Sequence, residues 1–159
     1  MKAFDSLDQF QRVTRCLRKI TEIALRPGNN LVIGDPEPMD LYRAFFIECQ
    51  NLKDYLKKDS RISDAKMVES FIDNSPMLKL CVDIGNSFKH AGLDNKPRSG
   101  MRLAKVNYAY SINLPPIQRD ATIGTEILVT FDNRQYKALE IATRCVSEWR
   151  KFMTAAKML

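Results

Sequence analysis

The chain has 159 residues, 45% of them hydrophobic, which is enough for one substantial core and short for two domains. Its 25 Lys and Arg against 19 Asp and Glu give a formal net charge of +6, which permits binding to nucleic acid, an anionic surface or an acidic partner. The N-terminus lacks the apolar region of a secretion signal, and no apolar run is long enough for a membrane span. We therefore expect one cytoplasmic domain, residues 1–159, with no membrane association.

Helical periodicity begins almost at once. Ser6, followed three residues later by Gln9, predicts a capping box at the start of a first helix, which Pro27 would end. Asp35-Pro36 predicts the start of a second helix, because proline is well tolerated at a first helical position. Lys57-Lys58 close this second helix with cations near its C-terminal dipole.

Two further helices are expected next. Ser63-Asp64 predicts the start of a short helix that Asp73-Asn74 ends. Ser75-Pro76 predicts the cap and first turn of a fourth helix, and Gly92 predicts its end.

The pattern changes in the last third of the chain. Residues 93–100 have the composition of a loop, and residues 104–112 then alternate with the period of a half-buried strand. A second strand is expected over 125–131, with a turn at Asp132-Asn133, before a long amphipathic helix from Ala138 onward. The predicted fold is mainly α: a bundle of about five helices with a β-hairpin, roughly residues 101–136, inserted before the C-terminal helix.

Cysteine usage argues against a metal site. Cys16, Cys49, Cys81 and Cys145 are far apart, each among apolar residues at helical spacing, and with one histidine a zinc site has few ligands. We expect the four thiols to be buried and reduced, and we expect no metal and no cofactor. Trp149 is likewise expected in the core.

The densest polar pattern lies on the fourth helix, which carries His90, the only histidine of the chain. At about 100° per residue, Lys79, Asp83, Asn86 and His90 fall within roughly 60° of arc and form a single polar stripe, beside a separate apolar face. Asp83 and His90 are nevertheless about 10 Å apart along the helix axis. A chemical site would therefore act along an extended ligand or across a symmetric interface, which predicts a homodimer built around this helix.

This segment of the fourth helix resembles a known protein superfamily. A short helical bundle with the segment Asp83-Ile84-Gly85-Asn86-Ser87-Phe88-Lys89-His90 resembles the HEPN superfamily. That resemblance implies a dimeric, metal-independent ribonuclease or a nucleic-acid-associated toxin, of the toxin-antitoxin or phage-defence type, with RNA and a cognate protein as partners. Members usually place an arginine where this chain has Asp83, and Lys89 would take over part of its role.

The resemblance assigns roles to individual residues. His90 would be the general acid or base toward a ribose hydroxyl, Asn86 would orient a phosphate oxygen, and Asp83 would orient a basic group. Phosphate charge would be neutralised by four cations, which are Lys89, Lys96, Arg98 and Arg102.

A structural reading stands beside the catalytic one. His90 can favour the dipole at a helix C-terminus, while Asp83 and Asn86 can bond to a neighbouring helix or to the β insertion. The protein would then be a non-catalytic interaction or scaffold module of a phage or mobile-element accessory system. The position of the stripe separates the readings, because a cleft favours chemistry and burial with satisfied partners favours a scaffold.

Overall fold

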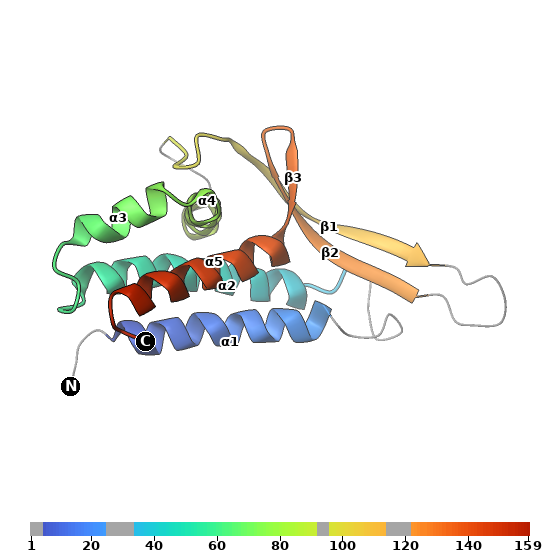
Figure 1. Ribbon diagram of the computed structural model, residues 1–159. Helices are drawn as coiled ribbons and strands as arrows, with labels where there is room; N and C mark the ends of the chain where they lie inside the picture. Colours follow the sequence, from blue (N-terminus) through green and yellow to red (C-terminus); the bar gives the residue numbers. More distant parts are fainter. Residues whose placement is uncertain (1–4, 25–33, 92–95, 114–121) are drawn as a thin grey trace.

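The computed structural model describes residues 5–24, 34–91, 96–113 and 122–159. This part of the chain forms five helices and one three-stranded antiparallel sheet, and the sheet precedes the last helix (Figure 1). The predicted mainly-α fold with a β insertion is therefore confirmed. The elements are α1 (Ser6–Ala24), α2 (Glu37–Lys58), α3 (Ala65–Asp73), α4 (Pro76–His90), β1 (Leu103–Asn113), β2 (Thr122–Phe131), β3 (Arg134–Lys137) and α5 (Ala138–Ala155).

The first helix begins where expected but with a different cap. The backbone N–H of Leu7 donates to the Asp5 carboxylate at 2.9 Å, so Asp5 caps α1 and Ser6 lies inside the helix. The Gln9 side chain donates instead to the carboxylate of Glu48 on α2, at 2.7 Å. The predicted capping box is wrong, because the neighbouring carboxylate is the stronger acceptor and Gln9 is used between helices.

The starts of α3 and α4 follow the sequence prediction. The Asp64 carboxylate accepts from the backbone N–H of Lys66 at 2.8 Å, and the Ser75 hydroxyl accepts from that of Leu78 at 3.3 Å. Helix α4 ends at His90, and Ala91 takes the left-handed conformation with a φ of 53°. The predicted stop at Gly92 lies outside the described residues.

Helix α2 packs against both α1 and α4 and contributes much of the core. Helix α4 approaches it closely at Gly85, where an added Cβ would lie 2.7 Å from the Phe46 carbonyl oxygen. Only glycine permits this separation. Trp149 of α5 is 1% exposed and packs edge-on against Phe152, which confirms its predicted place in the core.

The sheet order is β1-β2-β3, and β1 pairs with β2 in the register Tyr108 to Ile127. Strand β3 was not predicted, because its four residues are largely polar and show no apolar alternation. Strands β2 and β3 pack against α5, while the β1-β2 ribbon extends beyond the helices (Figure 1).

Two tyrosines fix this ribbon to the segment that leads into α2. The Tyr108 hydroxyl donates to the Asp35 carbonyl at 2.8 Å and accepts from the Met39 N–H at 3.1 Å. The Tyr110 hydroxyl accepts from the Gly34 N–H at 3.1 Å, and the two rings stack at 5.9 Å. Both tyrosines therefore hold the β1-β2 ribbon against the start of α2.

The cysteines differ in exposure. Cys49, Cys81 and Cys145 are buried, as predicted, whereas Cys16 is half-buried on α1, and all four are free thiols. Burial raises the pKa of the Cys49 and Cys145 thiols. None of the helices in the described ranges combines the length and the apolar run that a membrane crossing needs.

Candidate functional site

The centre of the predicted stripe, Asp83, is buried. It is 1% exposed, and its two carboxylate oxygens accept the backbone N–H groups of Arg98 and Ser99 at 2.8 and 2.9 Å. Backbone amides held by a carboxylate in this way form strong, charge-assisted hydrogen bonds. Asp83 therefore anchors the loop between α4 and β1 to the helix.

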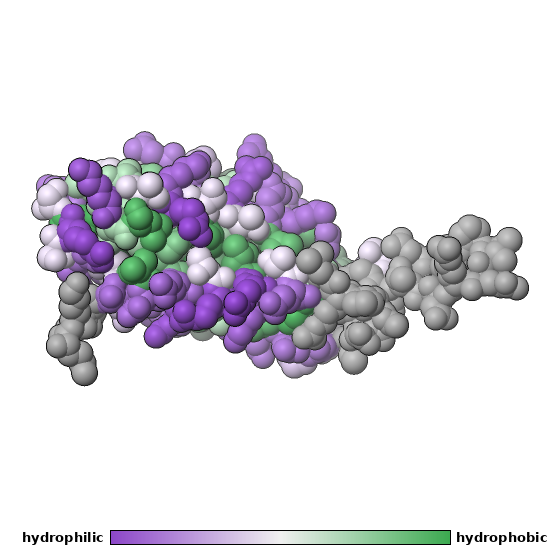
Figure 2. All heavy atoms as spheres, turned by 60° about the horizontal axis from the view of Figure 1, so that its bottom comes forward, coloured by the Kyte–Doolittle hydropathy of each residue, from purple (hydrophilic) through white to green (hydrophobic). Residues whose placement is uncertain are grey.

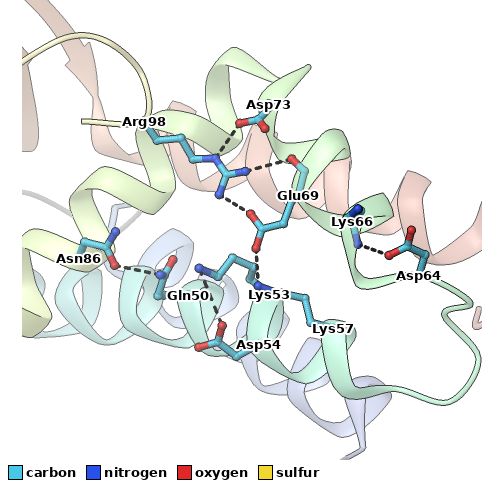
Figure 3. A network of polar contacts seen from close by, with 10 residues as sticks. All are labelled: Gln50, Lys53, Asp54, Lys57, Asp64, Lys66, Glu69, Asp73, Asn86 and Arg98. Carbon is cyan, nitrogen blue, oxygen red and sulfur yellow. Dashed lines mark hydrogen bonds and ion pairs between the residues drawn. The ribbon is translucent and has the colours of Figure 1, made fainter. Parts of the chain in front are cut away.

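The side chain of Arg98 continues from the same loop toward α3. Its guanidinium contacts the Asp73 carboxylate at 2.8 Å, the Glu69 carboxylate at 2.6 Å and the Glu69 carbonyl oxygen at 3.0 Å (Figure 3). Glu69 also pairs with Lys57 of α2 at 2.6 Å. Arg98 thus joins the loop to α3 by its side chain and to α4 by its backbone.

The pKa shifts of Arg98 and Glu69 both favour the charged forms that this network needs. Burial works against the charge of Arg98, but hydrogen bonds to Asp73 and Glu69 outweigh it and raise the pKa of Arg98. Burial likewise disfavours ionised Glu69, and its bonds to Lys57 and Arg98 lower the pKa of Glu69 overall. Arg98 is predicted above to contact phosphate, yet these carboxylates occupy its guanidinium.

Asn86 also faces the protein. Its side-chain oxygen accepts from the Gln50 amide of α2 at 2.9 Å, one residue after the close approach at Gly85 (Figure 3). This contact fixes the amide against α2.

The remaining predicted residues are exposed. Lys89 and His90 form the end of α4, and within the described ranges no hydrogen bond or ion pair joins His90 to Asp83, Asn86 or Arg98. Lys96 and Arg102 are also exposed. Arg102 bonds through its backbone to Asp132, whose carboxylate accepts from the Arg102 N–H at 3.1 Å.

The structure therefore divides the predicted site. Asp83 and Arg98 come together, but as an anchor for the loop, while Asn86 packs on α2 and His90 lies at the solvent-facing helix end. In the described part of the chain, no group of three or more His, Cys, Asp or Glu side chains is arranged to hold a metal ion.

Sequence reasoning missed the residues that complete this anchor. Glu69 and Asp73 lie four residues apart on α3, so both carboxylates reach one side of the helix, and this spacing was the available signal. Gly85 was also missed, although a glycine inside a helix often marks a close contact.

A second polar surface runs along α1. Four cations, Arg12, Arg15, Arg18 and Lys19, are exposed between Asp8 and Glu22, with no acidic residue among them. At about 100° per residue they cover roughly 120° of the helix. With α1 turned toward the viewer, Figure 2 shows hydrophilic residues along this face beside a hydrophobic strip. We call these four residues the α1 basic ridge.

Comparison with known proteins yields no relative: no family model, no curated protein and no solved structure matches the chain. The resemblance to the HEPN superfamily, and the ribonuclease and toxin functions that it implies, stay predictions.

Proposed function

We propose that the protein binds RNA through phosphate contacts and does not cut it with the residues of α4. The α1 basic ridge is the observation that carries the proposal, because it concentrates positive charge on one exposed helix face. Only Arg18 has a carboxylate partner among the described residues, Glu22 at 3.7 Å, and both side chains are about two-thirds exposed. Such a pair is weak and yields readily to phosphate.

Helix α5 places one more cation, Arg150, beside α1. The guanidinium of Arg150 lies 5.2 Å from the centre of the Phe10 ring of α1, and Arg150 is otherwise exposed. A cation held on an aromatic ring keeps its charge available to a backbone phosphate. The choice of RNA as the nucleic acid rests on the HEPN resemblance, and the charge pattern supports any phosphate backbone.

RNA cleavage is less well supported than RNA binding, because the residues of the α4 stripe do not lie together in one site. A metal-independent nuclease needs an acid or base together with groups that stabilise developing charge. His90 is exposed, while Asp83 accepts the backbone N–H of Arg98, and the Arg98 side chain is bound to α3. A homodimer around α4, which we keep as a prediction, would have to use the exposed Lys89-His90 end, since Asp83 lies under the loop.

The test is fluorescence anisotropy of a labelled single-stranded RNA of about 20 nucleotides, measured over a range of salt concentrations. Removing two ridge cations in Arg15→Ala/Lys19→Ala should weaken binding and lower the slope of log K against log salt by about 0.7 per lost contact. The matched control is Lys66→Ala/Arg134→Ala, which removes two exposed cations from α3 and β3. It should bind with nearly the wild-type slope.

The outcomes separate three functions. Equal weakening by both double variants would show diffuse attraction and no RNA site on α1. Wild-type protein that cuts RNA in the presence of a chelator, with activity lost in His90→Ala, would establish the ribonuclease instead. If the protein neither binds nor cuts RNA at low salt, the function that remains is the non-catalytic interaction or scaffold module. The proposal places the protein in the cytoplasm, in keeping with its four free thiols.

A further inference from the structure

A pocket of about 530 Å³ opens where the end of α1, helix α2, the sheet and α5 meet. Its volume lies within the range of about 300–1,000 Å³ that is typical of small-molecule sites. The lining is mainly apolar and includes Ala24, Ile127 and Leu139. The lining contains none of the residues predicted for catalysis, so this pocket is a separate site from the α4 stripe.

Tyr42 of α2 contributes a polar atom to this apolar lining. The residue is 7% exposed, yet no described residue forms a hydrogen bond with its hydroxyl. Tyr42 is one of the residues that line the pocket, so its small exposed part borders this space.

The chemistry of this hydroxyl is defined by its surroundings. Burial is the main cause, and the nearby Glu126 carboxylate a second one, that raise the pKa of Tyr42. The hydroxyl thus stays protonated at all physiological pH values and offers a hydrogen to an acceptor. Since none of the described residues accepts this hydrogen, an acceptor brought by a ligand in the pocket would be able to take it.

The rim of the pocket carries balanced charge. Lys137 pairs with Glu126 at 2.7 Å, and Arg144 pairs with Glu140 at 2.9 Å, and all four side chains are at least half exposed. Because each cation has its own carboxylate, the rim offers no net charge to attract an ion. An uncharged ligand fits this rim better than an anion.

We propose that this pocket binds a small, neutral and mainly apolar organic molecule with a carbonyl-type acceptor, which takes a hydrogen bond from the Tyr42 hydroxyl. The apolar lining would bury the body of the ligand, and Tyr42 would set its orientation. The site is independent of RNA binding, since none of the α1 basic ridge lines it.

The test uses prodan, a neutral naphthalene dye with one carbonyl group, titrated into the full chain. Prodan emits at shorter wavelength in apolar surroundings, and a hydrogen bond to its carbonyl moves the emission back to longer wavelength. We expect saturable binding to one site with a shift to shorter wavelength. Tyr42→Phe should weaken binding about fivefold and shift the bound emission further to shorter wavelength.

Two tryptophan substitutions on α5 supply the matched comparison. Thr143 and Thr154 are both exposed, but only Thr143 lines the pocket. Thr143→Trp should reduce affinity at least tenfold by filling the space, whereas Thr154→Trp should bind as the wild type does. The proposal is overturned if the wild type shows no saturable binding or if the two tryptophan variants bind equally. Unchanged affinity and emission in Tyr42→Phe would refute the role of the hydroxyl.

Discussion

Replacing Asp83 by asparagine tests directly whether this residue anchors the loop. The carboxylate accepts two backbone N–H groups at 2.8 and 2.9 Å in a position that is 1% exposed. Asparagine has one acceptor oxygen, so one N–H would keep its partner. The other would face the NH2 group of the new side chain, donor against donor.

The size of the effect follows from these contacts. A hydrogen bond to a charged group contributes about 1.5–3 kcal/mol, and a buried donor left without a partner costs about 1–3 kcal/mol. We therefore expect Asp83→Asn to lower the free energy of unfolding by about 3 kcal/mol. For a chain of this size that corresponds to a fall in Tm of about 6–12 °C.

Thermal unfolding followed by circular dichroism measures this fall. Asp73→Asn is the matched control, because Asp73 contacts the same arginine but has a 60% exposed side chain, and its Tm should change by less than about 2 °C. His90→Ala should also leave Tm nearly unchanged. The reasoning would be refuted if Asp83→Asn melted with the wild type. A variant that kept its Tm and lost RNA cleavage would make Asp83 a catalytic residue.

Three further predictions concern packing, thiol access and pH. Gly85→Ala should destabilise the protein by about 2 kcal/mol in urea unfolding, despite its better helix propensity, because the Cβ meets the Phe46 carbonyl at 2.7 Å; equal or greater stability would contradict this. A native thiol titration should show one fast cysteine and three slow ones, and Cys16→Ser should remove the fast phase. The bond to Arg61 lowers the pKa of Asp59 below its unfolded value, so this stabilisation is fully present above about pH 5 and should be lost progressively as the pH drops below about 4. Asp59→Asn should flatten that profile in acid unfolding, and an unchanged profile would argue against the bond.

The helices were predictable because their signals are local. Asp64 and Ser75 cap the helices they precede, and the spacing of Phe45, Cys49, Leu52 and Leu56 identifies the buried face of α2. The capping box failed because Gln9 found a partner 39 residues away, and no local rule weighs a contact of that range.

In the candidate site, too, the sequence pattern predicted which residues share a helix face but not which long-range contacts they make. The helical wheel placed Asp83, Asn86 and His90 on one side of α4, and a wheel cannot tell which part of that side another segment covers. Arg98 and Ser99 cover Asp83, and α2 meets Asn86 through Gln50. The Tyr42 pocket was missed for a related reason, because its lining comes from five elements, α1, α2, β2, β3 and α5, that meet only in the fold.

The double attachment of Arg98 has a consequence for how the molecule opens. Its backbone N–H is held by α4, its guanidinium by α3, and five residues later the chain enters β1. Lifting the sheet from the helices therefore exposes a buried carboxylate and breaks contacts to two helices at once, so partial opening at this joint is unfavourable. The amide hydrogens of Arg98 and Ser99, although they belong to a turn between helix and strand, are expected to exchange with solvent as slowly as those of the helical core. The connection between bundle and sheet thus behaves as a rigid joint, and a force applied to the β ribbon is passed to α3 and α4.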